Sequence, residues 1–89
     1  MVIFMKKYQA SIQITLKKGI LDVQGKAVEN ALHAIEFPML NNLRIGKFVE
    51  MTVEAENNEK AKALVIDACN KLVANPIIED FKITLTEFN

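Results

Sequence analysis

Residues 8–16 read YQASIQITL, and their side chains alternate strictly between apolar and polar. The apolar set comprises Tyr8, Ala10, Ile12, Ile14 and Leu16, and the polar set comprises Gln9, Ser11, Gln13 and Thr15. Successive side chains of a β-strand point to opposite faces of the sheet, so this pattern predicts a strand with one buried face. Such a sheet needs a second layer to cover its apolar side.

A helix is predicted to follow this strand, from Asp22 as the N-cap to about Glu36. Its apolar residues have the i, i+3, i+4, i+7 spacing of an amphipathic helix: Val28, Ala31, Leu32 and Ile35. The residues expected on its solvent-facing side are Lys26, Glu29, Asn30 and His33. Pro38 ends the helix, because the residue before a proline is disfavoured in the α conformation.

Residues 41–54, NNLRIGKFVEMTVE, are rich in strand formers. Gly46-Lys47 supplies a turn or bulge, which predicts two strands around LRI and FVEMTVE. One long bent strand also fits these residues. A second helix then begins at Asn57 or Asn58 and stops at Asn75-Pro76. Its predicted buried stripe is Ala61, Leu64, Val65, Ala68, Leu72 and Val73.

A last strand is predicted where Phe81, Ile83 and Leu85 alternate with polar residues. The expected order is β-α-β-β-α-β in a single domain spanning residues 1–89, with residues 1–7 as an N-terminal extension and Met5 as a possible start. This order predicts the α+β class: a ferredoxin-like two-layer sandwich with a four-stranded antiparallel sheet and two helices on one face.

Composition limits the classes of function. The 89 residues are 51% hydrophobic, with 11 basic and 11 acidic side chains. A net charge of zero gives no electrostatic footprint for a nucleic acid or an anionic membrane surface, so neither is an expected partner. The N-terminal apolar run is too short for a membrane span. Cys69 is the only cysteine, which fits a reducing, cytoplasmic setting.

Gly25-Lys26 at a helix start raises the question of a phosphate-binding loop. A Walker loop needs four residues between its glycines and a Ser or Thr after the Lys. Here the gap from Gly19 to Gly25 is one residue too long, and Ala27 stands at the hydroxyl position. We therefore interpret the segment as a strand-to-helix connection with Gly25 in the first helical turn.

The remaining reactive side chains are isolated. His33 is the only histidine and lies four residues after Glu29, a spacing that favours a surface pair. Cys69, at the margin of the second helix's apolar stripe, is expected to be a small buried hydrophobe. Glu79 and Asp80 would point to opposite faces of a strand. The sequence therefore predicts no catalytic residues, no metal site and no bound cofactor.

An RNA-recognition module has the same element order. Such modules stack bases on aromatic side chains of their central strands. The polar face of residues 8–16 has no aromatic residue, and Gly46-Lys47-Phe48-Val49 matches the module's motif only faintly. Acylphosphatase-like catalysis is also disfavoured, because the only arginine, Arg44, is distant from a glycine-rich loop.

The outer face of the predicted sheet is polar but carries little charge. It comprises Gln9, Ser11, Gln13, Thr15, Thr52, Thr84 and Thr86. Freely solvated sheet faces usually carry more Lys and Glu, so this face suits being covered by another chain. A solvated face remains the alternative, since Glu50, Glu54 and Lys82 share the same side. The residues by themselves indicate a small interaction protein.

Three stretches, LKKGILDVQGKAVENALHAI, LRIGKFVEMTVE and KLVANPIIEDFKI, occur in an order and spacing that resemble the PurS family, small subunits of phosphoribosylformylglycinamidine synthase. The resemblance runs from about Tyr8 to about Leu85. Val23 departs from it, because many relatives have Pro after the Asp, and this affects local rigidity only. The residues ahead of Tyr8 extend beyond the family's usual start.

The resemblance implies a role in de novo purine synthesis. It implies a homodimer or homotetramer that joins a glutaminase subunit to a large synthetase subunit, with ATP, Mg and glutamine used by those partners. The expected contact residues are Lys17, Lys18, Asp22, Gln24 and Lys26, with Arg44 and Lys47 as a second patch. Charge reversal at Arg44 and Lys47 is expected to weaken assembly. Ordinary solvated charge is the alternative for these residues, and a free-standing ferredoxin-like ligand-binding regulator is the alternative function.

Overall fold

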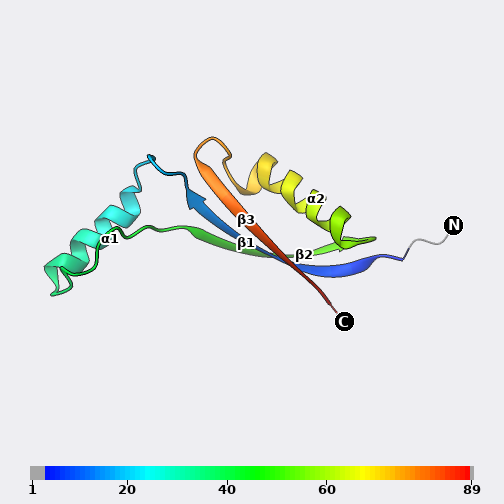
Figure 1. Ribbon diagram of the computed structural model, residues 1–89, viewed down its shortest axis with the longest axis horizontal. Helices are drawn as coiled ribbons and strands as arrows, with labels where there is room; N and C mark the ends of the chain where they lie inside the picture. Colours follow the sequence, from blue (N-terminus) through cyan, green and yellow to red (C-terminus); the bar gives the residue numbers. More distant parts are fainter. Residues whose placement is uncertain (1–3, 89) are drawn as a thin grey trace.

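The computed structural model describes residues 4–88 and is built from three strands and two helices (Figure 1). The elements in chain order are β1 (Lys6–Leu16), α1 (Val23–Ala34), β2 (Lys47–Ala55), α2 (Asn58–Ala68), the π-helical turn η1 (Cys69–Val73) and β3 (Glu79–Glu87). The α+β class is confirmed. Of the predicted extension, Lys6 and Lys7 belong to β1, and residues 1–3, with the possible start at Met1, lie outside the described residues.

Residues 8–16 lie in the central strand of the sheet. The strand order is β2-β1-β3, and both pairings are antiparallel. Ile12 stands opposite Val49 on one side and Ile83 on the other, and all three belong to one apolar cluster. Val65 and Cys69 complete this cluster from the second layer. The alternation of residues 8–16 therefore predicted the buried face correctly.

The predicted four-stranded sheet is wrong, because residues 43–45 form no strand. Carboxylates accept the backbone N–H groups of Leu43 and Ile45 instead. Leu43 donates to Glu29 Oε1 at 2.8 Å, and Ile45 donates to Asp22 Oδ2 at 2.7 Å. Side-chain acceptors of this kind compete with a sheet ladder for backbone donors.

Gly46-Lys47 forms no hairpin turn either. The chain continues through Gly46 directly into β2, whose pairing with β1 starts at Lys47 opposite Ile14. A Cβ at position 46 would lie 2.5 Å from the Ile14 carbonyl oxygen. Glycine is therefore needed here for the close approach of two backbones, and no turn is involved.

The expectation of two helices on one face of the sheet is also wrong. Only α2 covers the sheet, whereas α1 lies beyond its end (Figure 1). The molecule is consequently elongated, measuring 64 × 29 × 14 Å, with a radius of gyration of 17.7 Å. A compact domain of this length has a radius of gyration of about 12 Å. A single copy thus leaves much of its apolar surface uncovered.

The buried stripe of α2 is narrower than predicted. Ala61 and Val65 are buried, but Leu64 is 55% and Leu72 88% exposed. In η1 the Ala74 N–H donates to the Cys69 carbonyl, an i to i−5 bond of 2.9 Å. Within this wider turn, Val73 packs on the core and Leu72 is exposed to solvent.

The other face of the sheet is polar, as its register shows. Ser11 lies between Glu50 and Thr84, and Gln9 lies between Thr52 and Thr86. Gln9 also donates from Nε2 to Glu50 Oε2 at 2.9 Å. That another chain covers this face stays a prediction.

Candidate functional site

The end of β1, the start of α1 and the segment leading into β2 meet at one end of the sheet. We call residues 16–26 together with residues 42–47 the junction surface. The two predicted contact patches form one surface here, because Arg44 Nη2 donates to the carbonyls of Leu16 at 2.7 Å and Lys17 at 3.4 Å. All the contact residues expected from the sequence lie in this region: Lys17, Lys18, Asp22, Gln24, Lys26, Arg44 and Lys47.

Asp22 holds the junction surface together. Oδ1 accepts from the Gly25 N–H at 2.8 Å, which confirms the predicted N-cap, and Oδ2 accepts from the Ile45 N–H. The N–H groups of Ile45 and Gly25 lower the pKa of Asp22, with a smaller contribution from the Arg44 charge and partial opposition from burial. Asp22 is thus a structural residue whose carboxylate is already fully engaged.

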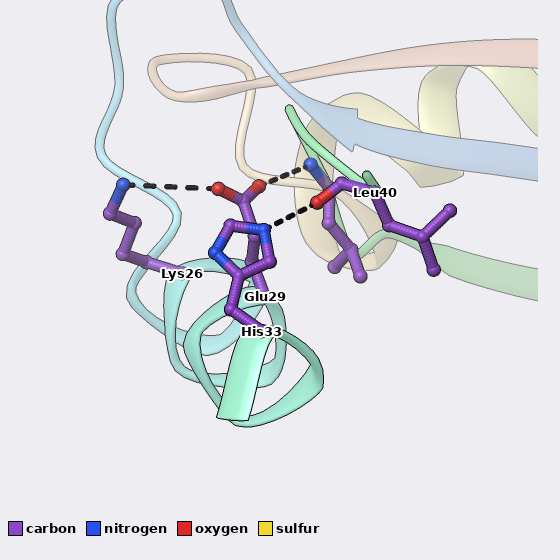
Figure 2. A network of polar contacts seen from close by, with 5 residues as sticks. Lys26, Glu29, His33 and Leu40 are labelled. Carbon is purple, nitrogen blue, oxygen red and sulfur yellow. Dashed lines mark hydrogen bonds and ion pairs between the residues drawn. The ribbon is translucent and has the colours of Figure 1, made fainter. Parts of the chain in front are cut away.

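Glu29 is a second structural carboxylate, which the sequence pattern did not predict. It was expected to face solvent, but its side chain is only 12% exposed and accepts the Leu43 N–H, while Lys26 lies 4.0 Å away (Figure 2). Glu29 follows Asp22 by two helical turns, so both carboxylates lie on the same side of α1. That seven-residue spacing was the available signal.

His33 does not pair with Glu29 as its spacing suggested. Its Nε2 lies 2.6 Å from the Leu40 carbonyl oxygen, to which the ring N–H donates in the corresponding tautomer (Figure 2). Glu29 and His33 therefore fasten residues 40–43 along one side of α1. The apolar stripe of the helix faces the other way, and Val28 and Ile35 are 39% and 61% exposed.

Lys47 already forms an ion pair with Glu79 within the fold. Its Nζ lies 3.2 Å from Glu79 Oε2, and the other Glu79 oxygen accepts the Asn75 N–H at 2.7 Å. The Asn75 N–H is the main cause of the lowered pKa of Glu79, partly opposed by burial, and Lys47 lowers it further. Reversing the charge of Lys47 would therefore disturb the start of β2 as well as the contact surface.

Three cavities adjoin the junction surface. One, of about 310 Å³, includes Thr15, Lys18, Arg44 and Asp80 in its lining, and the register places Thr15 opposite Asp80 on the face away from α2. A second, of about 300 Å³, is lined by apolar side chains such as Leu21 and Val23 and by the charged side chains of Asp22, Lys47 and Glu79. The third, of about 280 Å³, includes Asp22, Lys26, Glu29 and Arg44 in its lining. Each cavity therefore combines apolar walls with charged side chains.

The described residues offer few reactive groups. Burial raises the pKa of the Cys69 thiol, and its side chain is fully enclosed as predicted. Among residues 4–88, no group of three or more His, Cys, Asp or Glu side chains is placed to hold a metal ion. Within the same residues, no helix is long and apolar enough to cross a membrane.

Comparisons with known proteins agree with this fold along nearly the whole chain. The family model PurS, Phosphoribosylformylglycinamidine (FGAM) synthase, matches residues 9–87. The Bacillus subtilis (strain 168) phosphoribosylformylglycinamidine synthase subunit PurS is 38% identical over 80 residues, covering 90% of this chain and 94% of that protein.

Solved structures show the same shape. Methanocaldococcus jannaschii PurS superposes with a TM-score of 0.82 at 34% identity, covering 92% of this chain and 99% of that one. A chain in the structure of PurLQS from Thermotoga maritima superposes with a TM-score of 0.80 at 30% identity, covering 92% and 98%. This chain therefore belongs to the PurS family of phosphoribosylformylglycinamidine synthase subunits.

Proposed function

We propose that this chain acts without catalytic residues of its own and joins the glutaminase and synthetase subunits of FGAM synthase during de novo purine biosynthesis. The observation that carries this proposal is an elongated molecule with uncovered apolar surface in a family of synthase subunits. The related chain in PurLQS of Thermotoga maritima supports assembly with two other kinds of subunit. Interaction surface is what such a role requires.

A second copy of the chain is the first partner that we propose. The apolar stripe of α1 and its C-cap, including Val28 and Ile35, is exposed in a single copy. The helix itself lies beyond the end of the sheet (Figure 1). An amphipathic helix gains most of its stability by packing its apolar face against another element. A homodimer, or a homotetramer built from dimers, gives this stripe a place to pack. It also brings the two elongated molecules closer to the proportions of a compact domain.

Joining the two partner subunits serves the chemistry of ammonia. The glutaminase releases ammonia from glutamine, and the synthetase uses it with ATP to convert formylglycinamide ribonucleotide to the amidine. Ammonia in neutral water is mostly protonated and so loses its nucleophilic lone pair. An assembly that closes the path between the two sites keeps ammonia unprotonated and prevents its loss.

In this proposal, glutamine, ATP and Mg are bound by the partner subunits, and this chain binds no cofactor. The assembly works in the cytoplasm, where its small soluble substrates are found.

Reconstitution from three purified components tests this function. With glutamine as the nitrogen source, amidine formation is expected only when the glutaminase, the synthetase and this chain are all present. With ammonium chloride at alkaline pH, the synthetase is expected to work without this chain, because free ammonia then replaces the delivered nitrogen. This matched pair of assays separates nitrogen transfer from the ligation chemistry.

Two results would refute the proposal. One is full glutamine-dependent activity in mixtures that lack this chain. The other is turnover of a substrate by the purified chain alone. A thermal shift of the isolated chain with an amino acid or nucleotide would instead support the regulator alternative.

A further inference from the structure

Three cations of the junction surface form no ion pair within 4.0 Å among residues 4–88. Lys6, Lys7, Lys26, Lys47, Lys60 and Lys71 each lie within 4.0 Å of a carboxylate oxygen. Among residues 4–88, Lys17, Lys18 and Arg44 have no such neighbour. Arg44 contacts the backbone carbonyl of Lys17 and lines one cavity together with Lys18. The remaining unpaired cations, Lys62 and Lys82, are single residues on α2 and β3.

Arg44 is held in place by the backbone. Its two hydrogen bonds both leave from Nη2, toward the carbonyls of Leu16 and Lys17. A guanidinium has five N–H donors, so those on Nη1 and Nε keep no partner among the described residues. A side chain fixed by the main chain loses little entropy on binding, and the arginine fork suits a carboxylate.

The cavity beside these cations combines mostly apolar walls with a few charged side chains. Lys18 and Arg44 line its volume of about 310 Å³ together with the Thr15 side chain. Asp80 is its one carboxylate and offsets only part of the positive charge. Thr15 and Asp80 of its lining stand opposite each other on the sheet face away from α2.

The chain's own acids do not complement this cluster. Most of its carboxylates are engaged in ion pairs or hydrogen bonds. Within residues 4–88, those without such a contact are Glu36 after α1, Glu59 in the first turn of α2 and Asp80 in β3, so no two of them share an element. A second copy thus offers single acids at most. A group of acids that matches three cations has to come from a different protein.

We infer that the cluster of Lys17, Lys18 and Arg44, together with the adjoining cavity, docks an acidic segment of one of the other synthase subunits. This inference rests on the proposed function and adds the chemistry of the contact. Charge complementarity at an exposed site speeds association and selects the partner. Binding through this surface is therefore sensitive to salt.

Matched charge reversals test the inference. Lys18→Glu and Lys62→Glu each reverse an exposed lysine that has no acid within 4.0 Å, but only Lys18 lies in the cluster. Binding of each variant to the glutaminase and to the synthetase is measured at low and high salt. Lys18→Glu is expected to weaken binding to one of the two subunits about tenfold at low salt. The double variant Lys17→Glu/Lys18→Glu is expected to weaken that binding further. Lys62→Glu is expected to bind like the wild type.

The outcomes distinguish a failure of the proposed function from a failure of the docking inference. Circular dichroism and the mass of the oligomer show that the variants fold. If the wild-type chain binds neither subunit, the proposed function fails and this inference falls with it. If the wild type assembles and the double variant binds equally well, this inference alone is overturned.

Carbodiimide cross-linking of the assembled complex identifies the occupant, because it couples a lysine only to a carboxylate in direct contact. Links from Lys17 or Lys18 to Asp or Glu of another subunit are expected. Links only to Glu36 of a second copy would overturn the inference. So would a thermal shift with inorganic phosphate that the double variant loses while subunit binding is unchanged.

Discussion

Gly25 shows, at the scale of a single residue, how a glycine and lysine at a helix start can serve packing instead of phosphate binding. A Cβ at this position would collide with the Asp22 carboxylate and lie 2.9 Å from the Leu43 carbonyl oxygen. The glycine therefore lets the N-cap and the segment before β2 close around the helix start.

Gly25→Ala is expected to destabilise the protein. In an unhindered helix position the change would stabilise by about 1 kcal/mol, because alanine is the better helix former. Here the collision with Asp22 and Leu43 opposes that gain, and overpacking of this kind costs about 1–3 kcal/mol. Urea unfolding followed by circular dichroism measures the net change. A raised unfolding midpoint would contradict the close packing at Gly25.

Asp22 makes the junction surface sensitive to acid. Its pKa is lowered in the folded chain, so its stabilising effect is present above the unfolded value of about 3.9 and is lost as pH falls through the lowered folded value. Asp22→Asn cannot titrate and keeps only one oxygen acceptor. The variant is expected to be less stable than the wild type at pH 7, and the difference should shrink below about pH 4.

Unfolding of both proteins at pH 7, 5, 4 and 3 measures this difference. The comparison cancels the effect of other carboxylates, including Glu79, whose pKa is also lowered. A difference that stays constant with pH would rule out the titration of Asp22 as its cause.

The two helices both have an apolar stripe, but only one of these stripes packs on the sheet of the same chain. The cap of α2 is Asn57, whose Oδ1 accepts the Lys60 N–H at 2.9 Å, and Glu59 lies in the first turn. This helix packs its stripe on its own sheet through Val65 and Cys69. The first helix has an equally clear stripe but packs its polar side along residues 40–43.

Substitution at the start of α2 separates the two candidate caps. Asn57→Ala is expected to cost about 1 kcal/mol, because it removes the acceptor for an otherwise unpaired helix N–H. Asn58→Ala, at the first helical residue, should change stability by less than about 0.5 kcal/mol. Chemical denaturation of both variants provides the measurement. Equal losses would show that the hydrogen bond of Asn57 contributes nothing specific.

The elongation of the whole molecule implies that one copy is an incomplete unit. Its radius of gyration of 17.7 Å far exceeds that of a compact chain of the same length, about 12 Å. The solved Methanocaldococcus jannaschii chain superposes over 92% of this one, so this shape is shared with a relative. Stability and assembly should therefore depend on each other and on protein concentration.

Ile35→Glu tests this dependence. Ile35, the C-cap of α1, extends the exposed apolar stripe of that helix, and a charge there would have to be buried without a partner in the proposed dimer. Sedimentation equilibrium is expected to show a dimer dissociation constant at least about tenfold higher than that of the wild type. Asn30→Glu, on another side of the same helix, is the matched control and should leave the dimer intact. Unchanged dimers of Ile35→Glu would place the interface elsewhere.

Local patterns in the sequence determined most of the elements. The alternation of residues 8–16 predicted the central strand and its buried face, and Asp22 and the Asn57–Asn58 pair located the helix starts. The order of three longer stretches identified the family. These signals work because strand alternation and helix capping depend on residues only a few positions apart.

Only the tertiary structure decided what the elements pack against. The N–H groups of Leu43 and Ile45 find their acceptors 14 and 23 residues away, which no local pattern reveals, and so the expected fourth strand is absent. The same distant contacts turn the apolar stripe of α1 outward and bring Arg44 beside Lys17 and Lys18. Backbone donors must be paired somewhere, and the three-dimensional fold sets which of several acceptors is within reach.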